Sequence, residues 1–544
     1  MTDPGRDPQV PSSAPIQEVR RALAGVEGRR RVDLILAQPD PGAVVRALPA
    51  DELYFAIQDV GLADAQEIVQ MASADQFRAF LDLDVWRGNE PDPFRMLPWL
   101  RAASGASRSS DSEERRWRQK LAALDTELVS LLLRSALRIH DLEDDPDPDI
   151  EGDRFLRTPE GRFIVEFLPE GVDYMAIRRL VDELYEQEPF RAARLLSAVR
   201  WELPSELEET ALRWRTGRLA DLGYPSMEEA LSWFARPPPP SSPATSPPGP
   251  PARPPGFWLA ARRRGTLLDR AAALLAPDRL ARFEVDAMAG ANATMVADQV
   301  DATDADAVRG AIDAARALLE LGLESLSGGD DAAAAAVLAS LSLKRIFQQG
   351  FGRLLELRWR ARRLWQEGGA GTREAPLLDA PLAEAALAVD RRRPHYFPGL
   401  ETQRDEWGSV ASGVAAARAF RSLEEVHRTG AALADAEGLA ALARKLGLAP
   451  PAGFRGHATL AALYLTALAN ERLGRTFAVT PIDRRELRGA ADALRAIGDP
   501  RLAAEGAAGG LLATMARNRA AELAPLRDGE AVPPGAVTAL LLQP

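Results

Sequence analysis

Residues 41–86 have the sequence PGAVVRALPADELYFAIQDVGLADAQEIVQMASADQFRAFLDLDVW, and this stretch decides the fold class. Pro49 is placed to start a helix, because its fixed φ suits the first helical turn and its missing N–H is not needed there. Leu53, Ile57 and Val60 follow at i, i+4 and i+7, the spacing that puts apolar side chains on one face of a helix. The stretch therefore predicts short amphipathic helices rather than strands.

The same stretch predicts where these helices end and begin again. Gly61 supplies the left-handed conformation that commonly ends a helix. Ser73 and Gln76 have the spacing of a capping box, in which each side chain bonds the backbone N–H of the other, and so predict a further helix. Three short helices joined by minimal turns are typical of a superhelical stack.

The rest of the chain continues this helical pattern, with one exception. Residues 154–167 contain two apolar runs around the turn Thr158-Pro-Glu-Gly161, which predicts a small β-hairpin. We therefore expect a mainly all-α fold with two multi-helix halves and one hairpin near 154–167. Superhelical or solenoid-like stacking is one arrangement open to the two halves.

A proline-rich segment separates the two halves. Between Arg236 and Gly256, 11 of 21 residues are proline, a composition that excludes helix and central strand and favours an extended chain. Such a segment is either a spacer or surface insertion, which we expect, or a ligand for a proline-binding module. The predicted organisation is a disordered leader at 1–15, an N-terminal helical domain at 16–235, a linker at 236–256, a C-terminal helical domain at 257–520 and a frayed tail at 521–544.

Composition excludes several classes of function. A chain of 544 residues is too long for one core, and 46% hydrophobic with 27% charged residues is typical of a globular protein. The net charge of −12 argues against a general nucleic-acid binder, which needs an excess of Lys and Arg. The absence of cysteine excludes disulfides, thiolate metal sites and a cysteine nucleophile.

The sequence also bears on location. The amino terminus lacks the basic start and apolar run of a secretory signal. The most apolar run, Leu128–Ile139, is interrupted by Arg134 and is shorter than the roughly 20 residues that a membrane-spanning helix needs. We expect a buried helix there, no membrane span and a cytoplasmic protein. The preference for arginine over lysine, with many alanines, suggests a bacterial, GC-rich genome.

A search for catalytic motifs finds none. The chain has no H-E-x-x-H pair, no phosphate-binding P-loop and no G-x-S-x-G nucleophile elbow. Gly350-Phe-Gly352 lies within a helical pattern rather than after a strand, so we expect close helix packing there and not a dinucleotide-binding loop. We assign no catalytic residue and no evident cofactor.

One acidic run is the candidate metal site. Asp145, Asp147, Asp149 and Glu151 alternate with other residues ahead of a glycine, as in the first half of a calcium-binding loop. Thr158 stands where such a loop has its bidentate glutamate, so the second half of the pattern fails. We weigh a Mg²⁺ or Ca²⁺ site against a solvated acidic loop and prefer the acidic loop.

Two basic segments are candidate binding surfaces. Arg391-Arg-Arg-Pro-His-Tyr-Phe-Pro398 places arginines beside aromatic residues, a composition that binds phosphate or stacks on a base. The structural alternative is a helix end favoured by positive charge, with the aromatic residues packed on the core. Residues 358–365 are likewise either a basic partner-binding face or a solvated helix end. We prefer the structural interpretation of both segments.

An enzyme or ligand sensor would need a site assembled from residues far apart in the sequence. The candidate ligand-binding residues are Asn292, Arg345, Arg393, His395 and Tyr396. A deep pocket gathering Asn292, Arg345, His395 and Tyr396 would favour such a function, and an exposed apolar groove without buried charge would favour a scaffold.

Two family resemblances can be named. Residues 41–86, with Leu48-Pro-x-x-Glu-Leu53, resemble the helical cytosolic amino-terminal domain of magnesium transporters and flagellar motor-switch proteins; no transporter membrane segments follow, so transport is not implied. Over most of its length the chain resembles an uncharacterised bacterial family defined as a domain of unknown function, which implies no activity and no catalytic residue. This second resemblance rests on Asp82–Trp86, Arg157–Phe163, Ala291–Ala297, Arg345–Gly350 and Arg393–Pro398.

The leading functional hypothesis is a non-enzymatic helical scaffold or adaptor, because stacked helices offer extended surfaces and no catalytic motif is present. Its expected partner is another protein. The alternative is an enzyme, or a sensor of a small ligand or divalent cation, with a site built from distant residues. The sequence leaves the oligomeric state open.

Overall fold

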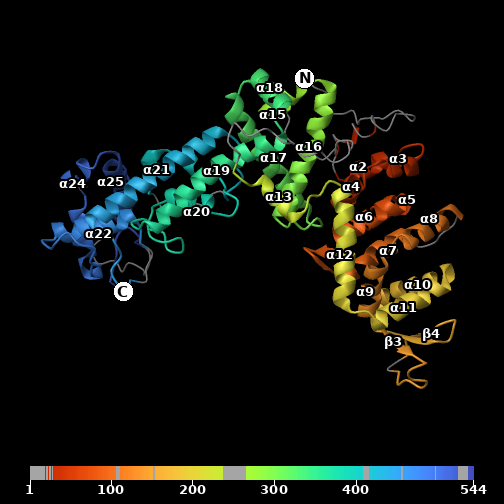
Figure 1. Cartoon of the computed structure of the whole chain (residues 1–544). Helices are drawn as coiled ribbons and strands as arrows, with labels where there is room; N and C mark the ends of the chain where they lie inside the picture. The colour runs from red at the N-terminus through yellow and green to blue at the C-terminus, as the bar shows by residue number, and fades with distance from the viewer. Residues whose placement is uncertain are drawn as a thin grey trace. The chain divides into compact units, whose positions relative to one another are not determined.

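The computed structural model describes residues 19, 22–23, 26, 28–105, 111–150, 153–236, 265–408, 416–454, 458–495, 498–524 and 537–543. Within these residues the fold is mainly α-helical with two small sheets, which confirms the predicted class. The chain forms two compact units (Figure 1). The first is drawn from Met1–Phe234, Pro243–Arg316 and Leu338–Lys344, and the second from Ala235–Ser242, Ala317–Val337 and Arg345–Pro544.

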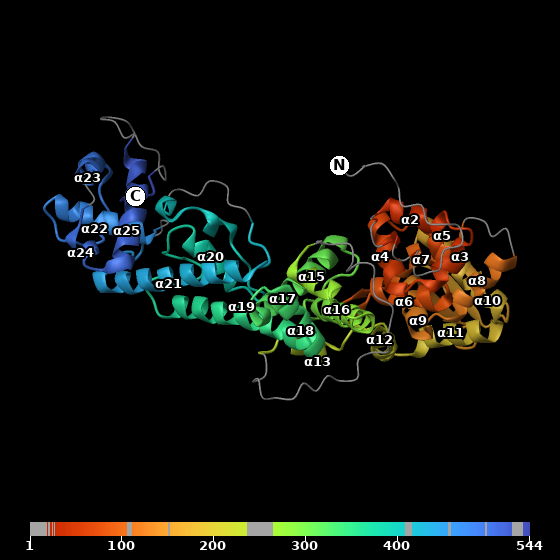
Figure 2. The ribbon, with the colours of Figure 1, turned by 90° about the horizontal axis from the view of Figure 1, so that it is seen from above.

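The first unit begins with a stack of short helices (Figures 1 and 2). Helix α2 packs on α4, α3 on α5, α4 on α6, α5 on α7 and α6 on α8, so each helix contacts the one two places along the chain. This regular order is the stacked arrangement that the sequence predicts. The helices are α2 (Arg29–Leu36), α3 (Pro41–Ala47), α4 (Ala50–Val60), α5 (Gln66–Met71), α6 (Ala74–Asp84), α7 (Met96–Ser104), α8 (Asp111–Ala122) and α9 (Thr126–Ala136).

Local signals set the ends of these helices. The predicted capping box opens α6, because Ser73 accepts the backbone N–H of Gln76 and its own N–H donates to the Gln76 side chain. Gly61 follows α4 with a φ of 92°, a conformation that L-residues with side chains rarely adopt. Leu53 and Ile57 are fully buried, as their spacing predicts.

A three-stranded sheet follows α9. Strands β4 (Phe155–Arg157) and β5 (Phe163–Phe167) pair in antiparallel fashion, which confirms the predicted hairpin. A third strand, β3 (Leu137–Asp141), pairs antiparallel with β5, so the order is β3-β5-β4. The apolar run predicts a helix as far as Ile139, but α9 ends at Ala136. From Leu137 onward burial alternates with every second residue, a pattern that suits a strand and not a helix.

Four further helices complete this part of the first unit, together with a two-stranded ribbon and a 3₁₀ turn. Helix α12 has only two fully buried side chains, Leu207 and Ala211, and polar contacts add to its attachment. Arg218 reaches from α12 to Asp82 at the end of α6 and to Asp125 before α9, with N–O distances of 2.6–3.0 Å. The elements are α10 (Gly171–Gln187), α11 (Pro189–Trp201), α12 (Pro204–Asp221), α13 (Met227–Trp233), β1 (Trp86–Arg87), β2 (Glu90–Pro91) and η1 (Pro93–Arg95).

The compact units differ from the predicted domains at 16–235 and 257–520. Helices α15 (Leu267–Ala273) and α16 (Pro277–Ala297) and the start of α17 (Ala305–Ser327) group with the first unit. The reason is that α13 packs along α16: a Cβ at Gly290 would lie 3.0 Å from the Trp233 ring. Residues 237–264, which include most of the predicted linker, lie outside the described residues, and their proline content does not determine which helices pack together.

The second unit is built around one buried helix, α22 (Leu460–Arg472), in which residues 460–470 are all buried. Such a helix must be covered on all sides; α25 and α23 pack on it. Within the described residues, no helix combines the length and apolarity required to cross a membrane. The other elements are α18 (Asp331–Ser340), α19 (Leu343–Gln366), α20 (Leu382–Val389), η2 (Pro398–Glu401), η3 (Arg404–Glu406), α21 (Leu423–Leu446), η4 (Arg484–Glu486), α23 (Leu487–Ala493), α24 (Pro500–Ala503), α25 (Gly506–Ala520) and η5 (Ala521–Leu523).

The end of the chain packs on this core. The sequence predicts that residues 521–544 fray, but Leu540 and Leu541 are buried and the Leu541 N–H donates to Thr466 on α22. Thr538 joins a partly buried network with Arg519 and Glu522. Burial of apolar side chains within this short segment outweighs the helix-breaking prolines that suggest fraying. Residues 525–536 and 544 lie outside the described residues.

Candidate functional site

Four of the five predicted ligand-binding residues lie in the second unit, and Asn292 lies in the first. Asn292, on α16, donates from Nδ2 to the carbonyl of Gly223 at 3.1 Å, and so ties α16 to the turn after α12. Its Oδ1 is buried and has no hydrogen-bond donor among the described residues. The geometry gives Asn292 a structural role, and binding by this residue stays a prediction.

Tyr396 and His395 are held within the fold of the second unit. The Tyr396 ring is fully buried; its hydroxyl accepts from Arg428 at 3.2 Å, and its backbone pairs with Arg418. Burial raises the pKa of Tyr396, although Arg428 opposes the shift. The backbone N–H of His395 donates to the Ala388 carbonyl, and the ring Nδ1 of His395 lies 2.7 Å from the Arg393 carbonyl oxygen. The aromatic packing predicted for the segment at 391–398 is therefore present.

The two basic segments of the sequence meet around one carboxylate, Asp390, which is the C-cap of α20. Arg362, on α19, donates from Nε to Asp390 at 3.1 Å. Arg373, from the loop before α20, places Nη1 3.7 Å from the other oxygen of Asp390. Arg393 lies with its guanidinium 5.8 Å from the centre of the Phe351 ring on α19. With Arg358, these residues form what we call the Asp390 cluster: Arg358, Arg362, Arg373, Asp390 and Arg393.

Arg358 is a member of the Asp390 cluster with a buried donor that is unsatisfied among the described residues. Its Nε is buried and has no hydrogen-bond acceptor within the described part of the chain. Burial lowers the pKa of Arg358, and the charges of Arg362, Arg393 and Arg373 lower it further, while Asp390 opposes the shift. The cluster therefore gathers four guanidinium groups in the neighbourhood of one carboxylate.

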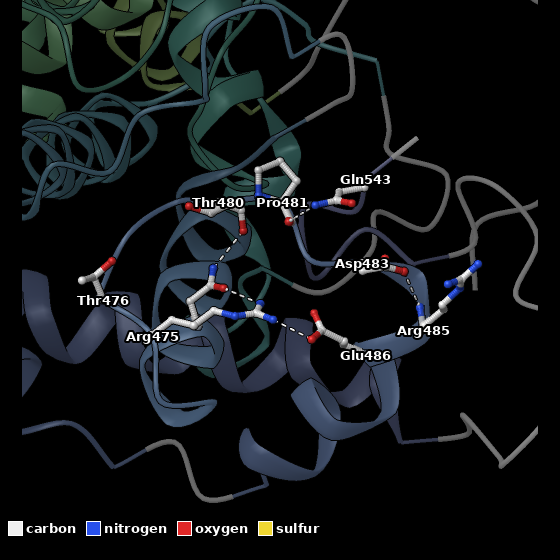
Figure 3. A pocket seen from close by; sticks show the side chains of 9 residues that line it. Arg475, Thr476, Thr480, Pro481, Asp483, Arg485, Glu486 and Gln543 are labelled. Atoms are coloured by element: carbon white, nitrogen blue, oxygen red, sulfur yellow. Dashed lines mark hydrogen bonds and ion pairs between the residues drawn. The ribbon is translucent and has the colours of Figure 1, made fainter.

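A polar pocket lies elsewhere in the second unit, beside α22 and η4 (Figure 3). Its volume is about 560 Å³. Asn470 anchors one wall by donating to the carbonyls of Ala478 and Thr480, and its Oδ1 accepts from Arg475. Arg475 also pairs with Glu486 at 2.6 Å. The pocket is lined by Asn470, Arg475, Thr476, Thr480, Pro481, Asp483, Arg485, Glu486 and Gln543.

Two of the charged residues that line the pocket, Arg475 and Glu486, pair with each other. The Arg475 guanidinium donates to Asn470 Oδ1 at 3.1 Å and to Glu486 at 2.6 Å, so it is already engaged on two sides; Figure 3 shows its pairing with Glu486. Gln543, from the C-terminal segment, closes the opposite side and donates to the Pro481 carbonyl at 3.3 Å. No sequence motif marks these residues, because the pocket forms only when the chain end packs beside η4.

The acidic loop offers no assembled metal site in the described residues. Asp145, Asp147 and Asp149 are exposed, and Asp145 accepts a hydrogen bond from the backbone N–H of Asp147. Glu151 lies outside the described residues. Among the residues that are described, no three acidic or histidine side chains stand close enough together to hold a metal ion. Binding of Mg²⁺ or Ca²⁺ stays a prediction.

Sequence comparison supplies a family. A family profile matches residues 10–527 of the chain. The chain belongs to DUF6178, a family of unknown function. The DUF6178 match spans residues of both compact units and contains all five segments on which the resemblance rests. No curated protein and no solved structure matches the chain, and the resemblance of residues 41–86 to magnesium transporters and motor-switch proteins finds no support.

One buried amine in the first unit has an unusual environment. Lys120, on α8, is 1% exposed and donates from Nζ to the Gln70 carbonyl at 2.8 Å. Burial, with a smaller contribution from Arg116, lowers the pKa of Lys120 from 10.5 to about 8. The ammonium form is therefore costly to bury at neutral pH.

We expect the stability of the first unit to depend on this amine. Between pH 8 and 10.5 the unfolded state binds a proton that the folded state does not, so the free energy of unfolding should rise with pH. Relative to a Lys120→Met variant, the wild-type protein should gain roughly 2–3 kcal/mol between about pH 7 and 11. Urea unfolding curves at several pH values, followed by circular dichroism, measure this difference.

Lys445 provides the matched control, because its side chain is 65% exposed and pairs with Glu505 on the surface. A Lys445→Met variant should show a pH dependence within about 0.5 kcal/mol of that of the wild type. A Lys120→Met curve that runs parallel to the wild-type curve up to about pH 11 would show that the buried amine titrates normally.

Proposed function

We propose that the chain is a non-enzymatic helical scaffold of the bacterial cytoplasm that binds another protein through α10–α12. The observation that carries the proposal is a group of large apolar side chains exposed on these three consecutive helices and the turn between α11 and α12. Phe190 is 89% exposed and Val172 69%, values far above those of core residues. The group consists of Val172, Met175, Phe190, Trp201, Leu203 and Trp214.

The apolar face of α12 supports protein binding. Leu207, Ala211 and Trp214 recur at i, i+4 and i+7 and so share a face of this helix. Leu207 and Ala211 are buried by the first unit, whereas Trp214 is 55% exposed. The apolar face therefore continues beyond the part that the fold covers. Exposed aromatic residues on such a face are typical of binding surfaces, where tryptophan is a frequent energetic anchor.

The expected partner is a different protein rather than a second copy of the chain. The formal net charge of −12 makes two copies repel each other, which favours a monomer. A partner with neutral or positive surroundings to its apolar surface would not meet this repulsion. Charge complementarity of this kind raises the rate of association and selects the partner.

Site-selective crosslinking in the native host tests this proposal. A photoreactive phenylalanine analogue would replace Trp201 or Trp214, and Trp359 on α19, which is 46% exposed, would carry the same probe as a control. We expect one protein to crosslink from positions 201 and 214 and not from 359. With that protein purified, a Trp201→Ser/Trp214→Ser variant should bind it roughly thirtyfold more weakly than the wild type does.

Two outcomes would contradict the proposal. Equal capture from all three positions would mean that the crosslinks reflect abundance and not a binding surface. If positions 201 and 214 crosslinked to a second copy of the chain, the surface would be a homodimer interface and not a binding site for another protein. Circular dichroism of the double variant checks that the fold is retained, as expected for exposed positions.

The polar pocket favours a second candidate function, the binding of a small polar ligand. Its volume of about 560 Å³ suits a ligand of metabolite size, and convergent polar groups fix the orientation of such ligands. Asn470 is 1% exposed, and its hydrogen bonds to Ala478 and Thr480 hold this wall of the pocket in place. If the protein is a sensor, one member of a metabolite library should raise its melting temperature. The same compound should not raise the melting temperature of a Gln543→Ala variant.

A further inference from the structure

The Asp390 cluster holds more positive than negative charge. Each of its guanidinium groups carries a full positive charge at every physiological pH. Asp390 offsets one of them, through its contacts with Arg362 and Arg373. The C-terminal end of α20 contributes about half a negative charge. Arg358, Arg362 and Arg373 alone therefore leave more than one positive charge in excess, before Arg393 is counted.

Two buried donors on α19 point to a missing acceptor. The Nε of Arg358 and the indole Nε1 of Trp365 are both buried, and neither has an acceptor in the described part of the chain. Residues 358 and 365 are seven apart, with Arg362 between them, so all three lie on one side of the helix. A buried donor without a partner costs stability, so native structures rarely keep one unless water or a ligand satisfies it.

We propose that the Asp390 cluster binds the phosphate group of a small ligand. A phosphate dianion carries the charge that the cluster lacks, and its oxygens match the fork of an arginine side chain. Arg358 supplies the guanidinium group whose Nε has no acceptor among the residues that the structure describes. The buried ring of Phe351 lies beside the Arg393 guanidinium and helps to position that arginine within the cluster.

The site is independent of the proposed protein-binding surface. It is built from residues of α19, the loop before α20 and the end of α20, all in the second unit, whereas α10–α12 belong to the first. Loss of phosphate binding and loss of protein binding are therefore separate experimental outcomes.

Isothermal titration of the full chain with inorganic phosphate and with phenyl phosphate tests the site. We expect saturable 1:1 binding at millimolar or lower concentration in a chloride buffer of matched ionic strength. An Arg358→Gln variant should bind about tenfold more weakly or worse. Tighter binding of phenyl phosphate than of inorganic phosphate would identify a phosphomonoester as the ligand, and equal binding would identify the free anion.

Arg363→Gln is the matched control, since Arg363 is exposed on the same helix and lies outside the cluster. It removes the same charge and should leave phosphate affinity within about twofold of the wild-type value. If both variants bound phosphate more weakly to a similar extent, the effect would reflect the overall charge of the protein, and the proposed site would be wrong. Absence of saturable binding by the wild type at millimolar phosphate would also overturn it.

A variant with the opposite expected effect guards against loss of folding as an explanation. Asp390→Asn removes the carboxylate that competes for the arginines, so phosphate should bind about threefold more tightly or better. Circular dichroism checks that the Asp390→Asn protein is folded. If the folded variant bound phosphate more weakly than the wild type, Asp390 would be needed to hold the arginines in place and would not compete with an anion for them. The proposal would then fail.

Discussion

Replacement of Arg218 by alanine is expected to lower the free energy of unfolding of the first unit by about 3–5 kcal/mol. Arg218 donates to both oxygens of Asp82 at 2.7 Å and to both oxygens of Asp125 at 2.6–3.0 Å. Asp82 is 1% exposed, so the variant leaves a buried carboxylate without its counter-charge. Urea unfolding followed by circular dichroism measures the loss, and hydrogen exchange localises it to α6, α9 and α12.

The cost is large because burial already works against the charged form of Asp82. Burial raises the pKa of this carboxyl above its ordinary value, although the hydrogen bonds and charge of Arg218 oppose the shift. Without Arg218, Asp82 must either take up a proton or attract water into the core. Helix α12 also loses contacts to α6 and to the residue before α9, while only Leu207 and Ala211 are fully buried on it.

Two further variants separate charge from packing. Arg218→Met keeps most of the side-chain volume and should be nearly as unstable as Arg218→Ala. Arg213→Ala removes an arginine that is 72% exposed on the same helix and pairs with Glu209, and should cost no more than about 0.5 kcal/mol. A wild-type stability for Arg218→Met would show that Asp82 needs no partner and that the ion pair contributes nothing.

The helices can be predicted because their signals are local. The capping box at Ser73 and Gln76 and the glycine stop at Gly61 act within one turn of the residues they affect, so the sequence contains all the information they use. The hairpin at 154–167 is predictable for the same reason. Strand β3 is not, because it is stabilised by pairing with β5, whose partner residues are far along the chain.

Long-range packing sets the features that sequence reasoning misses. Asp82 and Arg218 are separated by 136 positions, and no local pattern links them. The grouping of α16 with α13 and the burial of Leu541 against α22 are likewise contacts between distant segments. Each depends on surfaces that exist only after the local helices have formed.

The sequence predicts only part of the Asp390 cluster. Residues 358–365 and 391–398 are each recognisable as basic, but only as separate surfaces. Asp390 brings them together, because α20 ends beside α19 and its C-cap carboxylate faces Arg362. Arg373 carries no signal, since a single arginine in a loop is indistinguishable from any other charged surface residue. No sequence pattern predicts the pocket at Asn470 either.

Gly350 is a position where the local prediction and the long-range packing agree. We expect a Gly350→Ala variant to be less stable by about 3–4 kcal/mol, measured by urea unfolding of the second unit. A Cβ at Gly350 would overlap the Leu318 carbonyl oxygen and would lie 2.9 Å from the Gly322 nitrogen. Both clashes are with the backbone of α17, which cannot rotate away, so α19 and α17 must separate.

The control for this variant lies on α17 itself. Gly310 is helical, and a Cβ there would have no neighbouring atom within 4 Å, so Gly310→Ala should stabilise the protein by up to about 1 kcal/mol through helix propensity. Gly322→Ala should reproduce the loss, because its Cβ would overlap the Ile346 carbonyl oxygen. If Gly350→Ala and Gly310→Ala both stabilised the protein, α17 and α19 would not approach each other this closely, and the small residues in the Gly350 segment would need another explanation.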